Sequence, residues 1–243
     1  METDNEGVLA PHLMELRKRL LYSFLIILII ALILLPFSND LYHFISEPLL
    51  NHLPKSSTMI ATEVASPLLT PFKLTLSIAM LLAIPILLYQ LWAFIAPGLY
   101  NHERKLVFPI LFVGTTLFFL GIIFAYYIVF PLLLGFLTPA APEGVEVMTD
   151  ISSYLNFVLK LFFACGLVFE VPIVTILVIW TGVSTIQVLS EKRPYIIVGA
   201  FIVGMLLTPP DIISQTVLAI PIWLLFELGL VCARWLPKHT NNN

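Results

Sequence analysis

Long apolar runs, separated by short polar segments, dominate the hydropathy pattern of this chain. A helix that crosses the ~30 Å hydrocarbon core of a bilayer needs about 20 apolar residues. Six runs come near that length: 20–37, 74–96, 106–134, 151–180, 194–207 and 212–232. Backbone polar groups inside a bilayer must be satisfied within the chain, so each run predicts a helix, and the alternation typical of a membrane β-barrel is absent. We therefore expect an all-α membrane protein with six transmembrane helices in one polytopic domain, residues 1–243.

The composition supports this class of protein. Apolar residues make up 59% of the chain and charged residues 11%, with a mean hydropathy of +0.99, whereas a soluble domain averages ~25% charged residues. The net charge is −3 and no basic run is longer than Arg17-Lys18-Arg19, so no nucleic-acid partner is expected. Cys165 and Cys232 both lie in apolar sequence, and we expect small buried side chains rather than a disulfide.

Lys and Arg residues indicate the orientation, because short cytoplasmic loops carry an excess of them. Nine of the 12 lie in the two tails and in the second and fourth connections between spans. They are Arg17, Lys18, Arg19, Arg104, Lys105, Lys192, Arg193, Arg234 and Lys238. The opposite connections hold only Lys55. Both termini are therefore expected in the cytoplasm, and the first run, which is long and has five successors, is expected to be a retained helix rather than a cleaved signal peptide.

The connections on the outer side are long enough to form a cap. Residues 38–53 carry apolar side chains at helical spacing, which predicts a short amphipathic helix on the outer interface that Pro48 bends or divides. The second outer connection, 135–150, contains two prolines, ends at Asp150, and is expected to be an ordered cap or a loose loop.

Five prolines interrupt the apolar runs: Pro85, Pro109, Pro131, Pro172 and Pro221. Each removes a backbone N–H donor, so we expect kinked helices and a cupped arrangement rather than a tight bundle. The last two spans are predicted to be short, since 194–207 would be only about 21 Å long and the run from 212 meets Glu227. A thinned bilayer, a protein partner at this edge, or helices that extend into the headgroup layer would each accommodate such lengths.

Signatures of catalysis and metal binding are missing. The sequence has no His-Glu-x-x-His, Gly-x-Ser-x-Gly or P-loop motif, and its five histidines are scattered without metal-ligand spacing. An intramembrane aspartyl protease needs two aspartates in facing helices, whereas Asp150 and Asp211 lie at the outer ends of spans. We expect no enzyme, no metal site and no cofactor.

Three glutamates are candidate functional residues. Glu15 and Glu103 lie beside basic residues at the cytoplasmic face, where a carboxylate can bind a guanidinium through paired hydrogen bonds. The alternative, which the physics of exposed charges favours, is that each pairs with its own neighbours as a surface ion pair worth ~0–1 kcal/mol. Glu170 lies inside the fourth span, where an ionisable side chain is costly and indicates function. It would face a hydrated cavity or a partner, or be protonated, because Lys160 lies about 15 Å away along a regular helix.

Several segments together resemble the TatC family, the multispanning receptors of the twin-arginine protein translocase. They are His12-Leu-Met-Glu-Leu-Arg-Lys-Arg-Leu20, Phe94-Ile-Ala-Pro-Gly-Leu99, His102-Glu-Arg104, Phe169-Glu-Val-Pro172, Lys192-Arg-Pro194 and Gly204-Met-Leu-Leu-Thr-Pro-Pro-Asp211. They occur in this order over nearly the whole chain and on six predicted spans, so the resemblance is specific.

The resemblance implies the core receptor of twin-arginine translocation, in the bacterial cytoplasmic membrane. Its cytoplasmic face would read the consecutive arginines in the signal peptides of folded cargo. Glu15 and Glu103 would hold those arginines, with Arg17 and Phe94 in the same site, and this reverses the preference for surface ion pairs. The apolar part of the peptide would lie near Glu170, and the protonmotive force would drive transport, in agreement with the missing nucleotide motif.

The resemblance also implies partners. Single-span proteins of the TatB and TatA types would dock at the fifth and sixth helices, where Met205, Thr208 and Gln215 match the family's contact region. Pro48 and Asp150 would belong to an outer, periplasmic cap that is also involved in self-association within the receptor complex. The family assigns no role to Lys160.

Two other classes remain open on the residues alone. A proton-coupled transporter of small solutes would use Glu170 and the kinks, but it predicts repeated broken helices that the sequence does not show. A pure assembly scaffold would explain the short helices, but it leaves Glu15 and Glu103 without a purpose. We expect no pore within the chain itself, because no run carries a polar stripe.

Overall fold

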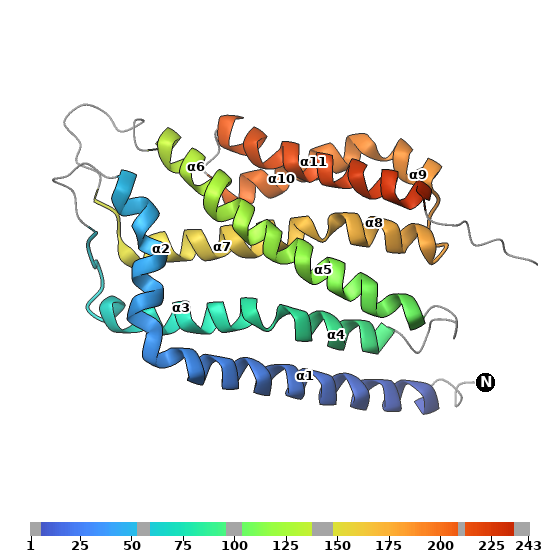
Figure 1. Ribbon diagram of the computed structural model, residues 1–243, viewed down its shortest axis with the longest axis horizontal. Helices are drawn as coiled ribbons and strands as arrows, with labels where there is room; N and C mark the ends of the chain where they lie inside the picture. Colours follow the sequence, from blue (N-terminus) through green and yellow to red (C-terminus); the bar gives the residue numbers. More distant parts are fainter. Residues whose placement is uncertain (1–5, 53–58, 96–103, 138–147, 209–211, 236–243) are drawn as a thin grey trace, which may run out of the picture. The chain divides into compact units, whose positions relative to one another are not determined.

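A computed structural model describes residues 6–52, 59–95, 104–137, 148–208 and 212–235, and all of its named elements are helical (Figure 1). They are α1 (Glu6–Leu34), the 3-10 turn η1 (Leu35–Phe37), α2 (Ser38–His52), α3 (Ser66–Leu82), α4 (Ile84–Ile95), α5 (Arg104–Phe124), the π-helical turn η3 (Ala125–Val129), α6 (Phe130–Leu137), α7 (Ile151–Phe169), α8 (Val171–Trp180), α9 (Ile186–Glu191), α10 (Arg193–Leu207) and α11 (Ile212–Trp235). The prediction of an all-α protein is confirmed.

Four helical segments within the described residues are long and apolar enough to cross a membrane. They are Met14–Glu47, Phe108–Gly135, Ile151–Trp180 and Ile212–Trp235. The bent pair α3 and α4 adds a fifth candidate, and α10 is a shorter apolar helix. These segments coincide with the six runs of the hydropathy pattern, and they make the chain a multi-pass membrane protein.

The chain forms two compact units, which are described separately. The first comprises Met1–Asn51, Met59–Thr115 and Thr149–Leu155, and the second comprises His52–Thr58, Thr116–Met148 and Asn156–Asn243. In the first unit, α1 packs along α3 and α4 (Figure 1). The buried residues of α1, Ser23 and Ala31, are small, as are Ala79 and Ala83 in the opposing segment. Small side chains let helix backbones approach closely, which is how helices associate in lipid.

The amphipathic helix predicted within residues 38–53 is present as α2. The chain turns sharply out of α1 at η1, which contains Pro36 (Figure 1). Ile45 and Ser46 of α2 are buried while Phe44 is exposed, as expected for an amphipathic helix. The predicted division at Pro48 is wrong, because α2 continues as one helix from Ser38 to His52.

Three of the five prolines coincide with interruptions of the α-helical pattern. Pro85 follows a 49° bend between α3 and α4, since it has no N–H to donate to the carbonyl one turn earlier. Pro131 follows the π-helical turn η3, and Pro172 follows the break between α7 and α8. At Pro109 and Pro221, by contrast, α5 and α11 continue without a break.

In the second unit, α11 packs against both α8 and α10. A Cβ atom on Gly229 would lie 2.9 Å from the Cα atom of Pro172, and one on Gly204 would lie 3.2 Å from the carbonyl oxygen of Gln215. A side chain on Gly229 would force the helices to shift, and one on Gly204 would fit only if the neighbouring backbone moved by a few tenths of an ångström.

The prediction of short fifth and sixth helices holds for α10 alone. The fifth helix, α10, has 15 residues, but α11 has 24 and passes through Glu227. The prediction for the cysteines is also only half right. Both thiols are free and Cys165 is buried, but Cys232 is exposed on α11.

Candidate functional site

The charged turn of α1 places a carboxylate and a guanidinium on one face of the helix. Glu15 and Arg19 are four residues apart, a spacing at which side chains on a helix are neighbours. Arg17 and Lys18, which lie between them in the sequence, are exposed. The carboxylate and guanidinium therefore form a pair distinct from the other charges of this turn.

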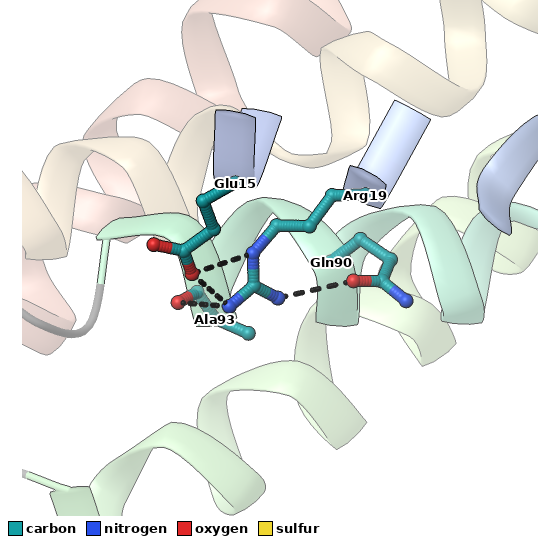
Figure 2. Close-up of polar contacts among 4 residues, drawn as sticks. All are labelled: Glu15, Arg19, Gln90 and Ala93. Atoms are coloured by element: carbon teal, nitrogen blue, oxygen red, sulfur yellow. Dashed lines mark hydrogen bonds and ion pairs between the residues drawn. The ribbon is translucent and has the colours of Figure 1, made fainter. Parts of the chain in front are cut away.

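Arg19 binds three acceptors that come from two helices (Figure 2). Its Nε donates to Glu15 Oε1 at 3.0 Å, and its Nη2 donates to the same oxygen. Its Nη1 donates to Gln90 Oε1 at 3.1 Å, and Nη2 also donates to the carbonyl oxygen of Ala93 at 3.0 Å. Gln90 and Ala93 lie one turn apart on the same face of α4. The guanidinium thus joins α1 to α4.

The cluster is only partly shielded from solvent. The side chain of Arg19 is 23% exposed and that of Glu15 is 38% exposed. Charge-assisted hydrogen bonds are shorter and roughly twice as strong as neutral ones, and partial burial strengthens them further. Among the residues the structure describes, all hydrogen bonds to the Glu15 carboxylate fall on Oε1. Oε2 is therefore available for a further donor.

The structure brings together only part of the predicted cytoplasmic site. Glu15 lies in the cluster, whereas the side chain of Arg17 is exposed. Phe94 follows Ala93 in α4, but its side chain lies outside the described residues, as does Glu103. Sequence reasoning missed the tertiary contacts of Arg19 and the contribution of Gln90. The available signal was a polar Gln in the otherwise apolar run 74–96.

Asp150 connects the segment at Thr62 to the first turn of α7, within the first unit. Its Oδ1 accepts hydrogen bonds from the backbone N–H (3.1 Å) and the hydroxyl (2.9 Å) of Thr62, and its Oδ2 accepts one from the backbone N–H of Ser153 (2.9 Å). These donors, with the backbone donors contributing most, lower the pKa of Asp150 to about 2. The Ser153 contact caps the N-terminus of α7, where a carboxylate also favours the helix dipole.

Further contacts hold the same outer region together. Ile60 forms an isolated parallel bridge with Asp150, through hydrogen bonds of 3.0 and 2.9 Å to the backbone around it. The hydroxyl of Tyr154 donates to the carbonyl of Ile45 in α2 at 2.8 Å. Most of the connection 135–150, predicted to be an ordered cap or a loose loop, lies outside the described residues. The predicted cap residue Pro48 lies in α2, with its side chain outside the described residues.

Glu170 lies at the break between α7 and α8. It occupies the position before the first residue of α8, but its side chain makes no capping hydrogen bond there. Its Oε1 atom is buried without a hydrogen-bond partner in the part of the chain that the structure describes. Lys160 in the preceding helix is exposed. A buried carboxyl oxygen without a hydrogen bond is costly to the fold.

The three predicted partner-contact residues differ in exposure. Met205 is 52% exposed on α10, and Gln215 of α11 is half-buried. Thr208 is buried, and both its hydroxyl and its backbone N–H donate to the carbonyl of Gly204 at 2.9 Å. Thr208 therefore ends α10 from within the unit, whereas Met205 presents its side chain to the surroundings.

Arg193 and Glu227 form an ion pair that sequence reasoning missed. Arg193 begins α10, and its Nε and Nη2 donate to the two carboxylate oxygens of Glu227 in α11, the latter at 2.9 Å. The pair is partly shielded, with 39% and 24% of the two side chains exposed. α11 continues past Glu227 to Trp235, and the bidentate partner compensates the charge of Glu227. Within the described ranges, no group of three or more His, Cys, Asp or Glu side chains could hold a metal ion.

The helices define the class as a multi-pass helical membrane protein, and comparisons give the family. The family model "Sec-independent protein translocase protein (TatC)" matches residues 11–221. The Sec-independent protein translocase protein TatC of Haemophilus influenzae is 57% identical over 232 residues, covering 96% of this chain and 91% of the relative. That of Escherichia coli K12 is 54% identical, covering 97% and 91%. A crystal structure of the twin-arginine translocase receptor TatC superposes with a TM-score of 0.80 at 36% identity, covering 92% of this chain and 98% of the other.

The chain belongs to the TatC family of Sec-independent protein translocases. The resemblance drawn from the sequence motifs is thereby confirmed, and with it the assignment to twin-arginine translocation and protein transport. The family is a component of transport rather than a catalyst of covalent chemistry.

Proposed function

We propose that this chain is the core receptor of a twin-arginine translocation system. It binds the Arg-Arg signal peptides of folded proteins at its cytoplasmic face, and it nucleates assembly of a translocation complex driven by the protonmotive force. The observation that carries this proposal is that Glu15, partly exposed in the N-terminal half of α1, already binds a guanidinium, that of Arg19 (Figure 2). Membership of the TatC family and the likeness to a twin-arginine translocase receptor support the same function.

Arginine specificity follows from the chemistry of a carboxylate. A guanidinium presents five N–H donors in a planar fork, whereas a lysine ammonium is a strongly hydrated point charge. Glu15 and Glu103 would each take one arginine of the pair, with Arg17 and Phe94 contributing to the same site. Loss of either carboxylate would remove one charge-assisted contact, and these contacts contribute about 1.5–3 kcal/mol each.

Six spans with both termini in the cytoplasm account for the helices and the charges together. The four long segments, the bent pair and α10 would make six crossings if each of them spans the membrane, and the Lys and Arg residues would gather on one side of such a topology. The location would be the inner membrane of a bacterium. The chain would form one polytopic domain, cupped around the path of the signal peptide.

Partners would bind at three places. TatB-type and TatA-type single-span helices would dock at the edge formed by α10 and α11, where Met205 is exposed and Gln215 half-exposed. Thr208 would shape this edge by ending α10. Glu170 would offer its buried carboxyl to a polar group of a partner or of a bound peptide, and the outer cap with Pro48 and Asp150 would support self-association.

The test is binding of a fluorescent signal peptide to the protein in nanodiscs. An Arg-Arg peptide is compared with its Lys-Lys counterpart on wild type, Glu15→Ala and Glu103→Ala, with Glu63→Ala as a control that removes an exposed glutamate elsewhere. We expect strong Arg-Arg binding that is lost with Lys-Lys and with either site variant but kept by the control. Equal binding in all combinations would assign the two glutamates to ordinary surface ion pairs.

A further inference from the structure

We propose that Glu15, Gln90 and the carbonyl oxygen of Ala93 form a guanidinium-binding cradle, which Arg19 occupies in the absence of a signal peptide and yields to one arginine of the peptide. The inference rests on the proposed receptor function and adds two things to it. It names further recognition groups on α4, and it names the side chain that the peptide displaces.

The geometry of the cradle is that of a site for one guanidinium. Three acceptors converge on a single planar group, each from a different residue and at 3.0–3.1 Å for Glu15, Gln90 and Ala93. Figure 2 shows Glu15 of α1 and the carbonyl of Ala93 of α4 on one side of the guanidinium, and Gln90 of α4 on the other. One of the three is charged and two are neutral, so the site is balanced for a single positive charge. A lysine ammonium could not reach all three acceptors with the fixed directions that a guanidinium offers.

The contacts of Arg19 are better explained by a side chain that can leave the cradle than by a fixed structural link between α1 and α4. It reaches the cradle from the same helix as Glu15, one turn away, and the pair remains partly exposed. Exchange of one guanidinium for another leaves the charge of the cradle unchanged. Glu15 is never left half-buried and unpaired, which would be costly. A released Arg19 side chain would join the exposed Arg17 and Lys18 in solvent.

A resident occupant makes a distinctive prediction for binding. Removing Arg19 should tighten the binding of an Arg-Arg peptide, because the peptide no longer competes with an internal guanidinium. Removing the Gln90 acceptor should weaken peptide binding when Arg19 is also removed, because the peptide arginine alone then loses that hydrogen bond. With Arg19 present, the resident and the incoming guanidinium both lose it, and peptide binding should change little. The tightening and the weakening are each expected to be about tenfold, the scale of one charge-assisted hydrogen bond.

The experiment measures the dissociation constant of a fluorescent Arg-Arg peptide and of its Lys-Lys counterpart on the full chain in nanodiscs. The variants are Arg19→Ala, Gln90→Leu and the double variant Arg19→Ala/Gln90→Leu, with Lys18→Ala as the matched control, since it also removes one positive charge from the same turn. We expect tighter Arg-Arg binding for Arg19→Ala than for Lys18→Ala. We expect weaker Arg-Arg binding for the double variant than for Arg19→Ala alone, with little change for the Lys-Lys peptide.

Weaker or unchanged binding for Arg19→Ala, relative to Lys18→Ala, would overturn the proposal and make Arg19 a structural link between α1 and α4. Should Arg19→Ala fail to fold, Arg19→Lys provides the same test, because it keeps the charge but releases acceptors of the cradle.

Glu15→Gln distinguishes failure of the proposed receptor site from failure of the cradle. If it leaves Arg-Arg binding intact, the proposed receptor site at Glu15 fails. If it abolishes binding while Arg19→Ala and the double variant Arg19→Ala/Gln90→Leu both bind the peptide like Lys18→Ala, only the cradle fails.

Discussion

At the residue scale, Asp150 carries the strongest local electrostatic feature outside the apolar helices. Both of its carboxylate oxygens accept hydrogen bonds, one from Thr62 and the other from the first turn of α7. An asparagine at this position would keep one acceptor oxygen but would turn an NH₂ group toward the donors on the other side. The hydrogen bonds on both sides of Asp150 therefore require a carboxylate, whose two oxygens both accept.

Asp150→Asn should lower the melting temperature of the protein, and the difference from wild type should depend on pH. The folded-state pKa is about 2, below the usual value of 3.8, so the carboxylate stabilises the fold fully above about pH 4 and progressively less as the pH falls toward 2. Thermal unfolding of both proteins in detergent between pH 7 and pH 2.5 measures this. Asp40→Asn, which removes an exposed carboxylate from α2, is the control. A difference between wild type and Asp150→Asn that stays constant down to pH 2.5 would contradict the assignment.

Single residues also show which contacts can be predicted from the sequence and which cannot. The Glu15–Arg19 pair is visible in the sequence, because four-residue spacing on a helix is a local property. Gln90 and Ala93 are far away in the chain, and only the packing of α4 on α1 brings them to the same guanidinium. Glu227 was mistaken for the end of a span for the same reason. Its partner Arg193 begins a different helix, and the pair reduces the cost of a charge that looks isolated in the sequence.

At the element scale, helix crossings depend on glycines that the hydropathy pattern does not reveal. A Cβ atom on Gly121 of α5 would lie 2.6 Å from the backbone carbonyl oxygen of Cys165 in α7. A Cβ atom on Gly166 would meet the ring of Phe118 at the same distance. The backbone at Cys165 cannot move aside as a flexible side chain would, so the two helices would have to separate.

Gly121→Ala should therefore destabilise the protein by roughly 1–3 kcal/mol, the usual cost of overpacking. Gly199→Ala in α10, where a Cβ atom would meet nothing within 4 Å, is the matched control and should be neutral or slightly stabilising because alanine favours helix. A thiol-reactive fluorescent dye reports unfolding through the buried Cys165 once the exposed Cys232 is replaced by Ser. Equal melting temperatures for the two alanine variants would show that the crossing is looser than the structure has it.

Helix breaks were only partly predictable from proline positions. Pro85, Pro131 and Pro172 accompany a bend, a π-helical turn and a break, respectively. Pro109 and Pro221 lie in helices that continue through them, as Pro48 does. Proline removes a donor in every case, but neighbouring packing decides whether the helix bends.

At the scale of the whole molecule, the number of crossings depends on α10. Its 15 residues span about 22 Å, which is shorter than the ~30 Å hydrocarbon core. A short helix is accommodated when the bilayer thins around it or a partner covers its ends. The hydropathy pattern predicted the existence of this helix correctly, because an apolar run is a local property. It could not establish that the helix crosses the membrane, which depends on its neighbours and on the lipid.

Single-cysteine labelling tests the crossing of α10 and the orientation of the chain together. In a background without Cys165 and Cys232, we place cysteines at the exposed positions Glu63, Lys192 and Trp235. A membrane-impermeant maleimide should label Glu63→Cys in intact spheroplasts, and should label Lys192→Cys and Trp235→Cys only after the membrane is opened.

Lys192 and Trp235 flank the α10–α11 pair, so they lie on the same side of the membrane only if both helices cross or neither does. Because α11 is long enough to cross alone, labelling of Trp235→Cys but not Lys192→Cys from outside would mean that α10 does not cross. Labelling of both from outside, with Glu63→Cys protected, would instead invert the topology inferred from the Lys and Arg residues.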